Sequence, residues 1–147
     1  MARERHGSSD ALVDELFETT VVLRTFVEGR LRPIGSSVAR LRALRILARE
    51  AEPLRMRDLS EMLGVAARTT TTIVDSLEQD GLVERVRHAD DRRAFLLTLT
   101  DAGRAQYEQA EAMDTRALAD ATGTLSAQER EQLRALLGKV RQAVESE

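Results

Sequence analysis

The sequence lacks cysteine and tryptophan altogether, and aromatic residues make up only 3% of its 147 residues. Without cysteine there is no disulfide framework, no thiolate metal site and no thiol redox centre. No apolar run approaches the roughly 20 residues that a membrane-spanning helix needs, and the polar first ten residues do not resemble a secretory signal. We therefore expect a cytoplasmic globular protein with no membrane contact.

The sequence is also short of the basic excess that many nucleic-acid-binding domains carry. It holds 22 basic and 25 acidic residues, a formal net charge of -3, and Lys139 is its single lysine. Arginine suits bidentate contacts with phosphates and bases, but a GC-rich genome would produce the same preference. Any affinity for phosphate must therefore come from where the arginines are placed.

Motifs that carry catalysis are missing as well. There is no G-x-S-x-G elbow and no phosphate-binding glycine loop, and the only histidines are His6 and His88. His88 precedes Asp90 and Asp91, but one histidine beside two loop carboxylates is much more often a polar loop than a metal site. We expect no enzyme activity, no metal and no cofactor.

The N-terminal segment predicts a long amphipathic helix. Ser8, Ser9 and Asp10 offer N-cap oxygens, apolar residues recur at helical spacing over residues 11–32, and Pro33 ends the helix. About 20 residues at roughly 1.5 Å each make an element about 30 Å long. Because so small a domain cannot bury both sides of it, the pattern favours a dimer over the alternative, a compact monomeric bundle.

The C-terminal segment predicts two further helices with apolar stripes. Thr100 can cap a helix that fades near Gly123, and Ser126 and Glu129 form an S-x-x-E capping box that opens the last helix. Leucines and valines follow at i, i+3, i+4 and i+7. We therefore assign residues 10–35 and 101–147 to dimerisation.

Residues 36–100 predict a unit of three helices and two main strands. Ser36 or Ser37 can cap its first helix, and Gly64 closes its second. The expected elements are a helix that ends between Arg49 and Glu52, a very short strand at Leu54 and Arg55, helices at residues 56–63 and 66–79, and strands at residues 82–87 and 94–99. The fold class is therefore mainly α with a small antiparallel β-hairpin, a winged helix-turn-helix flanked by N- and C-terminal dimerisation helices.

The helix at residues 66–79 contains the run Thr69–Thr72, which by propensity favours a strand. The spacing of Ile73 and Leu77 and the turn at Gly64 outweigh that preference. Thr69 or Thr70 then joins the buried face, and the outward residues are Ala67, Arg68, Thr71, Thr72 and Ser76. Outward threonines offer hydroxyls to phosphates or bases and methyl groups to thymine.

Four motifs follow one another along the chain: PLRMRDLSEMLGV, IVDSLEQDGLVER, the D-x-R motif Asp91-Arg92-Arg93, and LTLTDAGR. Each is weak alone, but the ordered set resembles the multiple antibiotic resistance regulator (MarR) family of bacterial winged-helix transcription factors over nearly the full chain. The resemblance implies a homodimer joined by its terminal helices, each protomer binding half of a pseudo-palindromic site in double-stranded DNA. It places recognition-helix contacts on Ala67, Arg68, Thr69, Thr71 and Thr72.

The resemblance also places a wing arginine, Arg93, in the minor groove, with Asp91 helping to hold it and Arg92 as a neighbouring candidate. The alternative for these residues is a solvated loop with a local ion pair to Asp90 or Asp91.

Three departures from the family pattern lower the expected affinity for DNA. Ala66 stands where Ser or Thr commonly caps the recognition helix, and Arg55 stands where Ser or Thr often opens the preceding helix. Thr72 and Ser76 replace basic residues that are common there. We therefore expect fewer phosphate contacts and a shallower salt dependence than a basic homologue has.

The sequence thus leads to the hypothesis of a ligand-responsive homodimeric repressor, whose effector changes the distance between its two recognition helices. The small-molecule effector is unidentified and its pocket unknown; Arg24, Arg30, Arg42 and Arg45 are candidate anion partners, with a solvated helix face as the alternative for each. A second hypothesis is a helical protein–protein adaptor that keeps the winged fold without DNA binding. The negative net charge and the uncapped Ala66 favour this second hypothesis.

Overall fold

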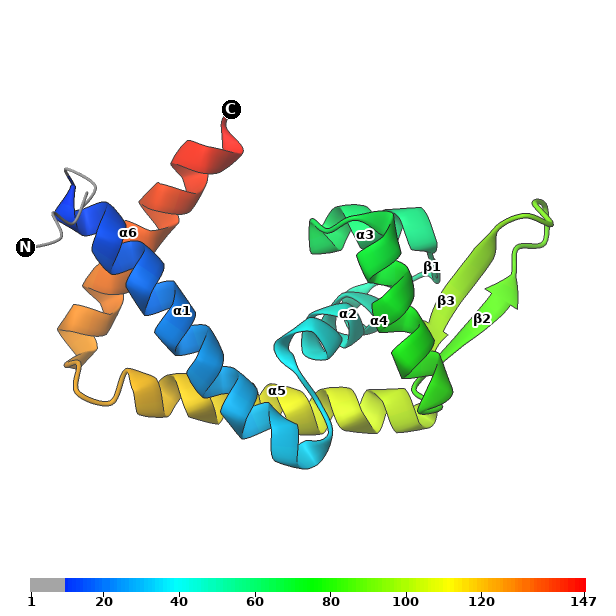
Figure 1. The fold of residues 1–147 in the computed structure, drawn as a ribbon, viewed down its shortest axis with the longest axis horizontal. Helices are drawn as coiled ribbons and strands as arrows, with labels where there is room; N and C mark the ends of the chain where they lie inside the picture. Colours follow the sequence, from blue (N-terminus) through cyan, green and yellow to red (C-terminus); the bar gives the residue numbers. More distant parts are fainter. Residues whose placement is uncertain (1–9) are drawn as a thin grey trace, which may run out of the picture.

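The computed structural model describes residues 10–147, so the predicted roles of Ser8 and Ser9 lie outside the described residues. It is mainly helical with a small antiparallel sheet, as the sequence predicts (Figure 1). The elements are α1 (Ala11–Leu31), a 3-10 turn η1 (Arg32–Ile34), α2 (Val38–Arg49), β1 (Leu54–Arg55), α3 (Met56–Leu63), α4 (Ala67–Gln79), β2 (Val83–Arg87), β3 (Phe95–Leu99), α5 (Asp101–Ala121) and α6 (Ala127–Glu145).

The helix boundaries follow local signals in the sequence. The Asp10 carboxylate accepts a hydrogen bond from the Leu12 N–H at 2.9 Å, and Ser37, Thr100 and Ser126 cap α2, α5 and α6. The Ser126 cap is the predicted capping box, because Glu129 also accepts from the Ser126 N–H. Satisfying these otherwise unpaired donors fixes where each helix begins.

The sheet has one more strand than the predicted hairpin. Its order is β1-β3-β2, and both pairings are antiparallel. We refer to β2, β3 and the loop between them as the wing. Leu54 pairs with Leu97 and Arg55 with Leu96, so the very short strand before α3 is bonded to strand β3 of the wing. This pairing joins segments some 40 positions apart, and it places Arg55 beside the wing hairpin.

A continuous core holds the helix-turn-helix and the sheet together. Leu44, Leu59, Leu77 and Leu97 come from α2, α3, α4 and β3, and none of them has an exposed side chain. A smaller cluster joins α1, α2 and α5 through Val27, Leu31, Leu41, Ala110 and Ala117. Burying a leucine of this kind stabilises the fold by about 1.5–3 kcal/mol.

The terminal helices are arranged very differently from this core. In the view of Figure 1, α1 overlaps α6 at one end, the winged unit (residues 36–100) lies at the other, and α5 runs beneath both as a long connection. No residue of α6 is buried, and α6 makes no extensive contact with another element of residues 10–147. Phe17 of α1 and Val144 of α6 are each 71% exposed. None of the described helices is long and apolar enough to cross a membrane.

Candidate nucleic-acid interface

Helix α4 contains four consecutive threonines, and three of them, Thr70, Thr71 and Thr72, bond their hydroxyls to the backbone of the helix itself. The hydroxyls of Thr71 and Thr72 donate to the carbonyls of Ala67 and Arg68, four residues back, at 3.0 and 3.1 Å. Such bonds use up the hydroxyl proton. The exposed side chains of Thr71 and Thr72 therefore offer acceptor lone pairs and methyl groups to a ligand, but no free donor for a phosphate.

Thr70 fixes the turn between α3 and α4. It is fully buried, and its hydroxyl accepts from the Ser60 hydroxyl at 2.7 Å and donates to the Ala66 carbonyl at 3.3 Å. Of the two predicted inward positions, Thr70 is therefore the buried one and Thr69 is exposed. Ala66 is the N-cap of α4 and makes no side-chain bond there, which leaves the N–H groups of the first turn open to another acceptor.

The prediction that Ser76 faces outward is wrong. Its side chain is half-buried, and its hydroxyl accepts from Arg40 Nη1 of α2 at 2.8 Å. The same guanidinium pairs with the Asp80 carboxylate at the end of α4 at 2.8 Å. A long side chain from α2 thus occupies the space that the helical pattern of α4 alone leaves to solvent.

The wing takes its shape from backbone bonds around Asp91. The Asp91 carboxylate accepts from the Arg93 N–H at 3.0 Å, its carbonyl accepts from the Ala94 N–H at 3.1 Å, and the His88 N–H donates to the Ala94 carbonyl at 3.0 Å. None of the ion pairs within residues 10–147 involves Arg92 or Arg93. Asp91 therefore organises the turn that carries Arg93, and leaves the guanidinium itself open.

His88 lies at the start of the wing loop, directly after β2. Its Nδ1 accepts from the Asp90 N–H at 3.1 Å, and its Nε2 lies 3.4 Å from Arg55 Nη2. A guanidinium in this position is a poor neighbour for a metal cation. Within residues 10–147, no group of three or more potential ligand residues is arranged to hold a metal ion.

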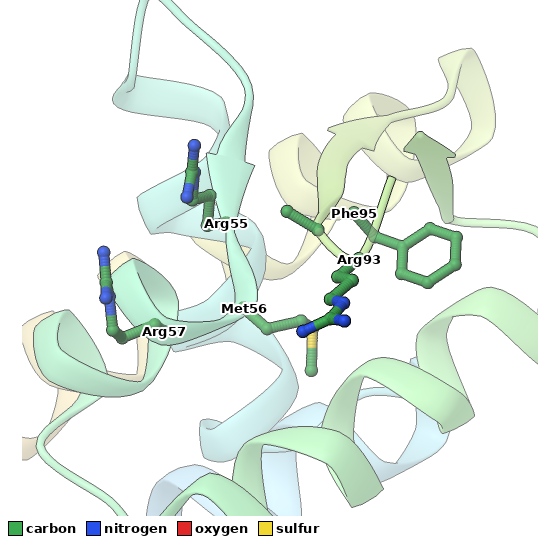
Figure 2. Close-up of a pocket in the computed structure, with 6 residues that line it drawn as sticks. Arg55, Met56, Arg57, Arg93 and Phe95 are labelled. Carbon is green, nitrogen blue, oxygen red and sulfur yellow. The ribbon is translucent and has the colours of Figure 1, made fainter. Parts of the chain in front are cut away.

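A shallow hollow of about 250 Å³ lies where the wing meets the start of α3 (Figure 2). Arginines line it and no acid does; the lining residues are Arg55, Met56, Arg57, Arg93, Ala94 and Phe95. Neither Arg55 nor Arg57 is among the contact residues predicted from the sequence. The pairing of β1 with β3 brings them beside the wing, and the signal in the sequence was the Arg-x-Arg spacing at the start of α3.

The acids of α4 are paired with arginines from neighbouring elements. Arg85 of β2 forms ion pairs with Asp75 and, at 3.3 Å, with Glu78, and Asp80 pairs with Arg40. Arg68, at the exposed start of α4, takes part in no ion pair of the described chain. The acids of α4 are therefore paired, and Arg68 is left with an exposed charge at the start of the helix in spite of the net charge of -3.

The four arginines considered as anion partners are engaged inside the protomer. Arg24 lies 3.9 Å from Glu28, Arg30 pairs with Asp120 at 3.0 Å, and Arg42 donates to the Leu63 carbonyl at 2.9 Å; Arg45 bonds Glu111 and Asp114 at 2.8 and 3.1 Å. Burial acts to lower the pKa of Arg45, but the bonds and charges of Glu111 and Asp114 outweigh it and raise that pKa. Arg42 and Arg45 are thus links from α2 to α3 and α5.

The chain shares its central unit and its fold with known regulators. The MarR family model matches residues 37–95. The chain is 31% identical to the uncharacterized HTH-type transcriptional regulator YdgJ of Bacillus subtilis over 107 residues, which cover 73% of this chain and 65% of that protein. It is 30% identical to the uncharacterized regulator YwhA of the same organism over 99 residues, which cover 67% of this chain and 70% of YwhA.

A third relative links the similarity to solved structures. The HTH-type transcriptional repressor Rv2887 of Mycobacterium tuberculosis is 29% identical over 125 residues, 85% of this chain and 89% of its own. Its complex with DNA superposes with a TM-score of 0.77 and 27% identity, and its complex with salicylic acid with 0.73 and 28%; each covers 90% of this chain and 98% of that one. These similarities favour a DNA-binding regulator over a protein–protein adaptor. The chain belongs to the MarR family of transcriptional regulators.

Proposed function

We propose that the protein is a homodimeric repressor, without enzyme activity, that acts in the cytoplasm and releases a pseudo-palindromic DNA site when a small molecule binds. The observation that carries this proposal is the joint surface of α4 and the wing. There the acids of α4 are paired with arginines of neighbouring elements, while Arg68, Arg92 and Arg93 are exposed and outside the ion pairs of residues 10–147.

In this proposal α4 enters the major groove. Arg68 has the length and the paired donors to bond the N7 and O6 atoms of a guanine. The neighbouring side chains are small or methyl-bearing and would contact thymine methyl groups; the set of recognition-helix contacts is Ala67, Arg68, Thr69, Thr71 and Thr72. Their readout would rest more on shape and methyl contacts than on donors, because the hydroxyls of Thr71 and Thr72 are already bonded within the helix.

The wing would contact the adjacent minor groove through Arg93, with Arg92 beside it. A narrow minor groove concentrates negative potential, which attracts an arginine side chain. Arg93 is available for this contact because it forms no ion pair within residues 10–147. Asp91 would act by holding the turn through its bond to the Arg93 N–H. Arg55 and Arg57, on the other side of the hollow in Figure 2, are placed to meet phosphates of the DNA backbone.

The dimer would form through residues 10–35 and 101–147. Helix α6 buries none of its residues within the protomer, and α1 leaves an apolar stripe uncovered. The exposed apolar residues of the two helices include Leu12, Phe17, Val21, Val22, Leu133, Leu136, Leu137, Val140 and Val144. Two copies would then present two α4 helices to half-sites about one helical turn, roughly 34 Å, apart.

Repression and its release are supported by the relative Rv2887, which is named a repressor and has been solved both with DNA and with salicylic acid. An effector that favours a different separation of the two α4 helices would weaken binding to both half-sites together. The effector of this protein would act in that way.

The Arg93→Ala variant tests the wing contact. Each dimer would lose two charged groove contacts, so the slope of log affinity against log salt concentration should become shallower by about two. Binding is measured by fluorescence anisotropy on the upstream region of the protein's own gene. Arg49→Ala removes an exposed arginine at the end of α2, outside α4, the wing and the proposed dimerisation segments, and is the matched control. Parental affinity and slope in Arg93→Ala would show the wing assignment to be wrong.

A further inference from the structure

Three helices meet at the side chain of Arg40. It extends from α2, and its side chain is only 14% exposed. Its Nη1 donates to the Ser76 hydroxyl of α4 at 2.8 Å, and its Nη2 bonds the Asp80 carboxylate at 2.8 Å and the Gln106 side-chain carbonyl of α5 at 3.5 Å. One guanidinium therefore contacts the end of the recognition helix and the long connecting helix at the same time.

This bridge matters because α4 and α5 have little direct contact. In the described chain, α2 packs against both α4 and α5, whereas α4 and α5 share no extensive contact of their own. At the start of α5, the Thr100 hydroxyl donates to the Gly81 carbonyl at 2.6 Å, just past the end of α4. The orientation of α4 relative to α5 therefore depends on this junction and on the packing of both helices against α2. Among the polar contacts of α2, those of Arg40 reach both helices from a single rigid group.

The chemistry of arginine suits a positioning role. Its donors lie in one plane with fixed directions, so bonds to oxygens on two helices constrain the angle between those helices and not merely their distance. The positive charge also lies by the last turn of α4, where the helix dipole is negative. Ser76 lies in that turn, and Asp80 is the C-cap residue that follows it.

We propose that Arg40 is a positioning residue that fixes the orientation of α4 relative to α5. Because α5 belongs to the proposed dimerisation segment, Arg40 also sets the separation of the two α4 helices across the dimer. This second statement rests on the proposed function. Loss of Arg40 leaves α4 folded against α3 and β2 but free to vary in tilt, so the protein no longer distinguishes the half-site spacing of its operator.

The first experiment measures discrimination between DNA spacings. The Arg40→Met variant keeps the aliphatic length and removes all three contacts. Arg42→Met is the matched control, since Arg42 lies on the same helix and bonds the Leu63 carbonyl of α3, with no bond to α4 or α5. Each protein is titrated with the operator and with a duplex that carries one extra base pair between the half-sites, and its thermal unfolding is recorded.

The preference of the parent for the correctly spaced duplex should fall about tenfold in Arg40→Met, which corresponds to one lost charge-assisted hydrogen bond. Arg42→Met should keep the parent's preference even if its melting temperature falls. Ser76→Ala, which removes a single acceptor, should give a smaller change in the same direction and replaces Arg40→Met if that variant does not fold. Arg40→Met and Ser76→Ala proteins that both keep the parent's preference would overturn the proposal.

A second experiment needs no DNA. The chain has no cysteine, so Gln79→Cys on α4 and Gln109→Cys on α5, both at exposed positions, accept a pair of nitroxide labels. Pulsed electron paramagnetic resonance then gives the distribution of α4–α5 distances in protein mixed with an excess of unlabelled chain. Arg40→Met should broaden this distribution, and Arg42→Met should not.

An unchanged distribution in Arg40→Met would overturn the positioning role, whatever the DNA results. A broadened distribution in a protein that binds no duplex would support the positioning role and remove the proposed function instead. The two readouts therefore separate failure of the inference from failure of the function on which its second half rests.

Discussion

The winged unit and the terminal helices differ in how far they bury their apolar side chains within one protomer. In the winged unit, α2, α3, α4 and the sheet each contribute side chains to a core in which Leu44, Leu59 and Leu77 are fully buried. In α6, by contrast, every leucine is at least partly exposed and no residue is buried. Helix α6 nevertheless has apolar spacing as regular as that of α2 in the winged unit. The difference shows that apolar periodicity marks a face that must be covered, but not which chain covers it.

The largest expected effect comes from placing a charge on the uncovered face. Leu137→Glu introduces one carboxylate per protomer into the proposed interface, and burying such groups without partners should cost on the order of 4 kcal/mol of association, about a thousandfold in Kd. Sedimentation equilibrium measures this change. Since Leu137 is 51% exposed in the protomer, the winged unit should stay folded, and the variant should keep a helical circular dichroism spectrum. Gln142→Glu, on the opposite face of α6, is the control and should leave the dimer intact.

Shortening a buried side chain in the winged unit should lower the free energy of unfolding and leave association of the dimer less affected. Leu77→Ala removes a fully buried side chain from α4 and should cost about 3 kcal/mol of unfolding free energy, through lost burial and the cavity left behind. Denaturant unfolding followed by circular dichroism measures it. If Leu77→Ala weakened association more than folding, the division of the molecule into a self-sufficient unit and a partner-dependent one would be wrong.

The smallest expected effect concerns the uncapped start of α4. Ala66 makes no capping bond, whereas Ser126 and Glu129 cap α6 from both sides. Ala66→Ser should therefore stabilise the fold by about 1 kcal/mol, measured as a rise in the denaturant midpoint at an unchanged slope. The matching variant Ser126→Ala should lower stability by a similar amount. No gain in Ala66→Ser would mean that the first N–H groups of α4 are already satisfied.

Features of the fold that depend on neighbouring residues could be predicted from the sequence. The caps at Ser37, Thr100 and Ser126 and the turn at Gly64 lie where the local chemistry places them. The helical state of the threonine run was also predictable, because the spacing of Ile73 and Leu77 reports on packing against α3 and the sheet.

Features that depend on contacts between distant segments were missed. The pairing of β1 with β3 spans the whole helix-turn-helix, so the Arg-x-Arg spacing of Arg55 and Arg57 does not by itself place these residues beside Arg93. The inward position of Ser76 was missed for the same reason, since it is decided by Arg40 on another helix. The assignments of Ala67, Arg68, Asp91, Arg92 and Arg93 came from the family resemblance and remain proposals.

Because no residue of α6 is buried within the protomer, the activity of the protein should depend on its concentration in the cell. A helix that gains its packing only from a second copy makes the stability of the assembled protein inseparable from its concentration. Occupancy of the promoter would then rise faster than in proportion to the number of chains per cell, because assembly precedes binding. At low copy number the promoter would be nearly unoccupied, and a modest rise in synthesis of the protein would increase its occupancy steeply.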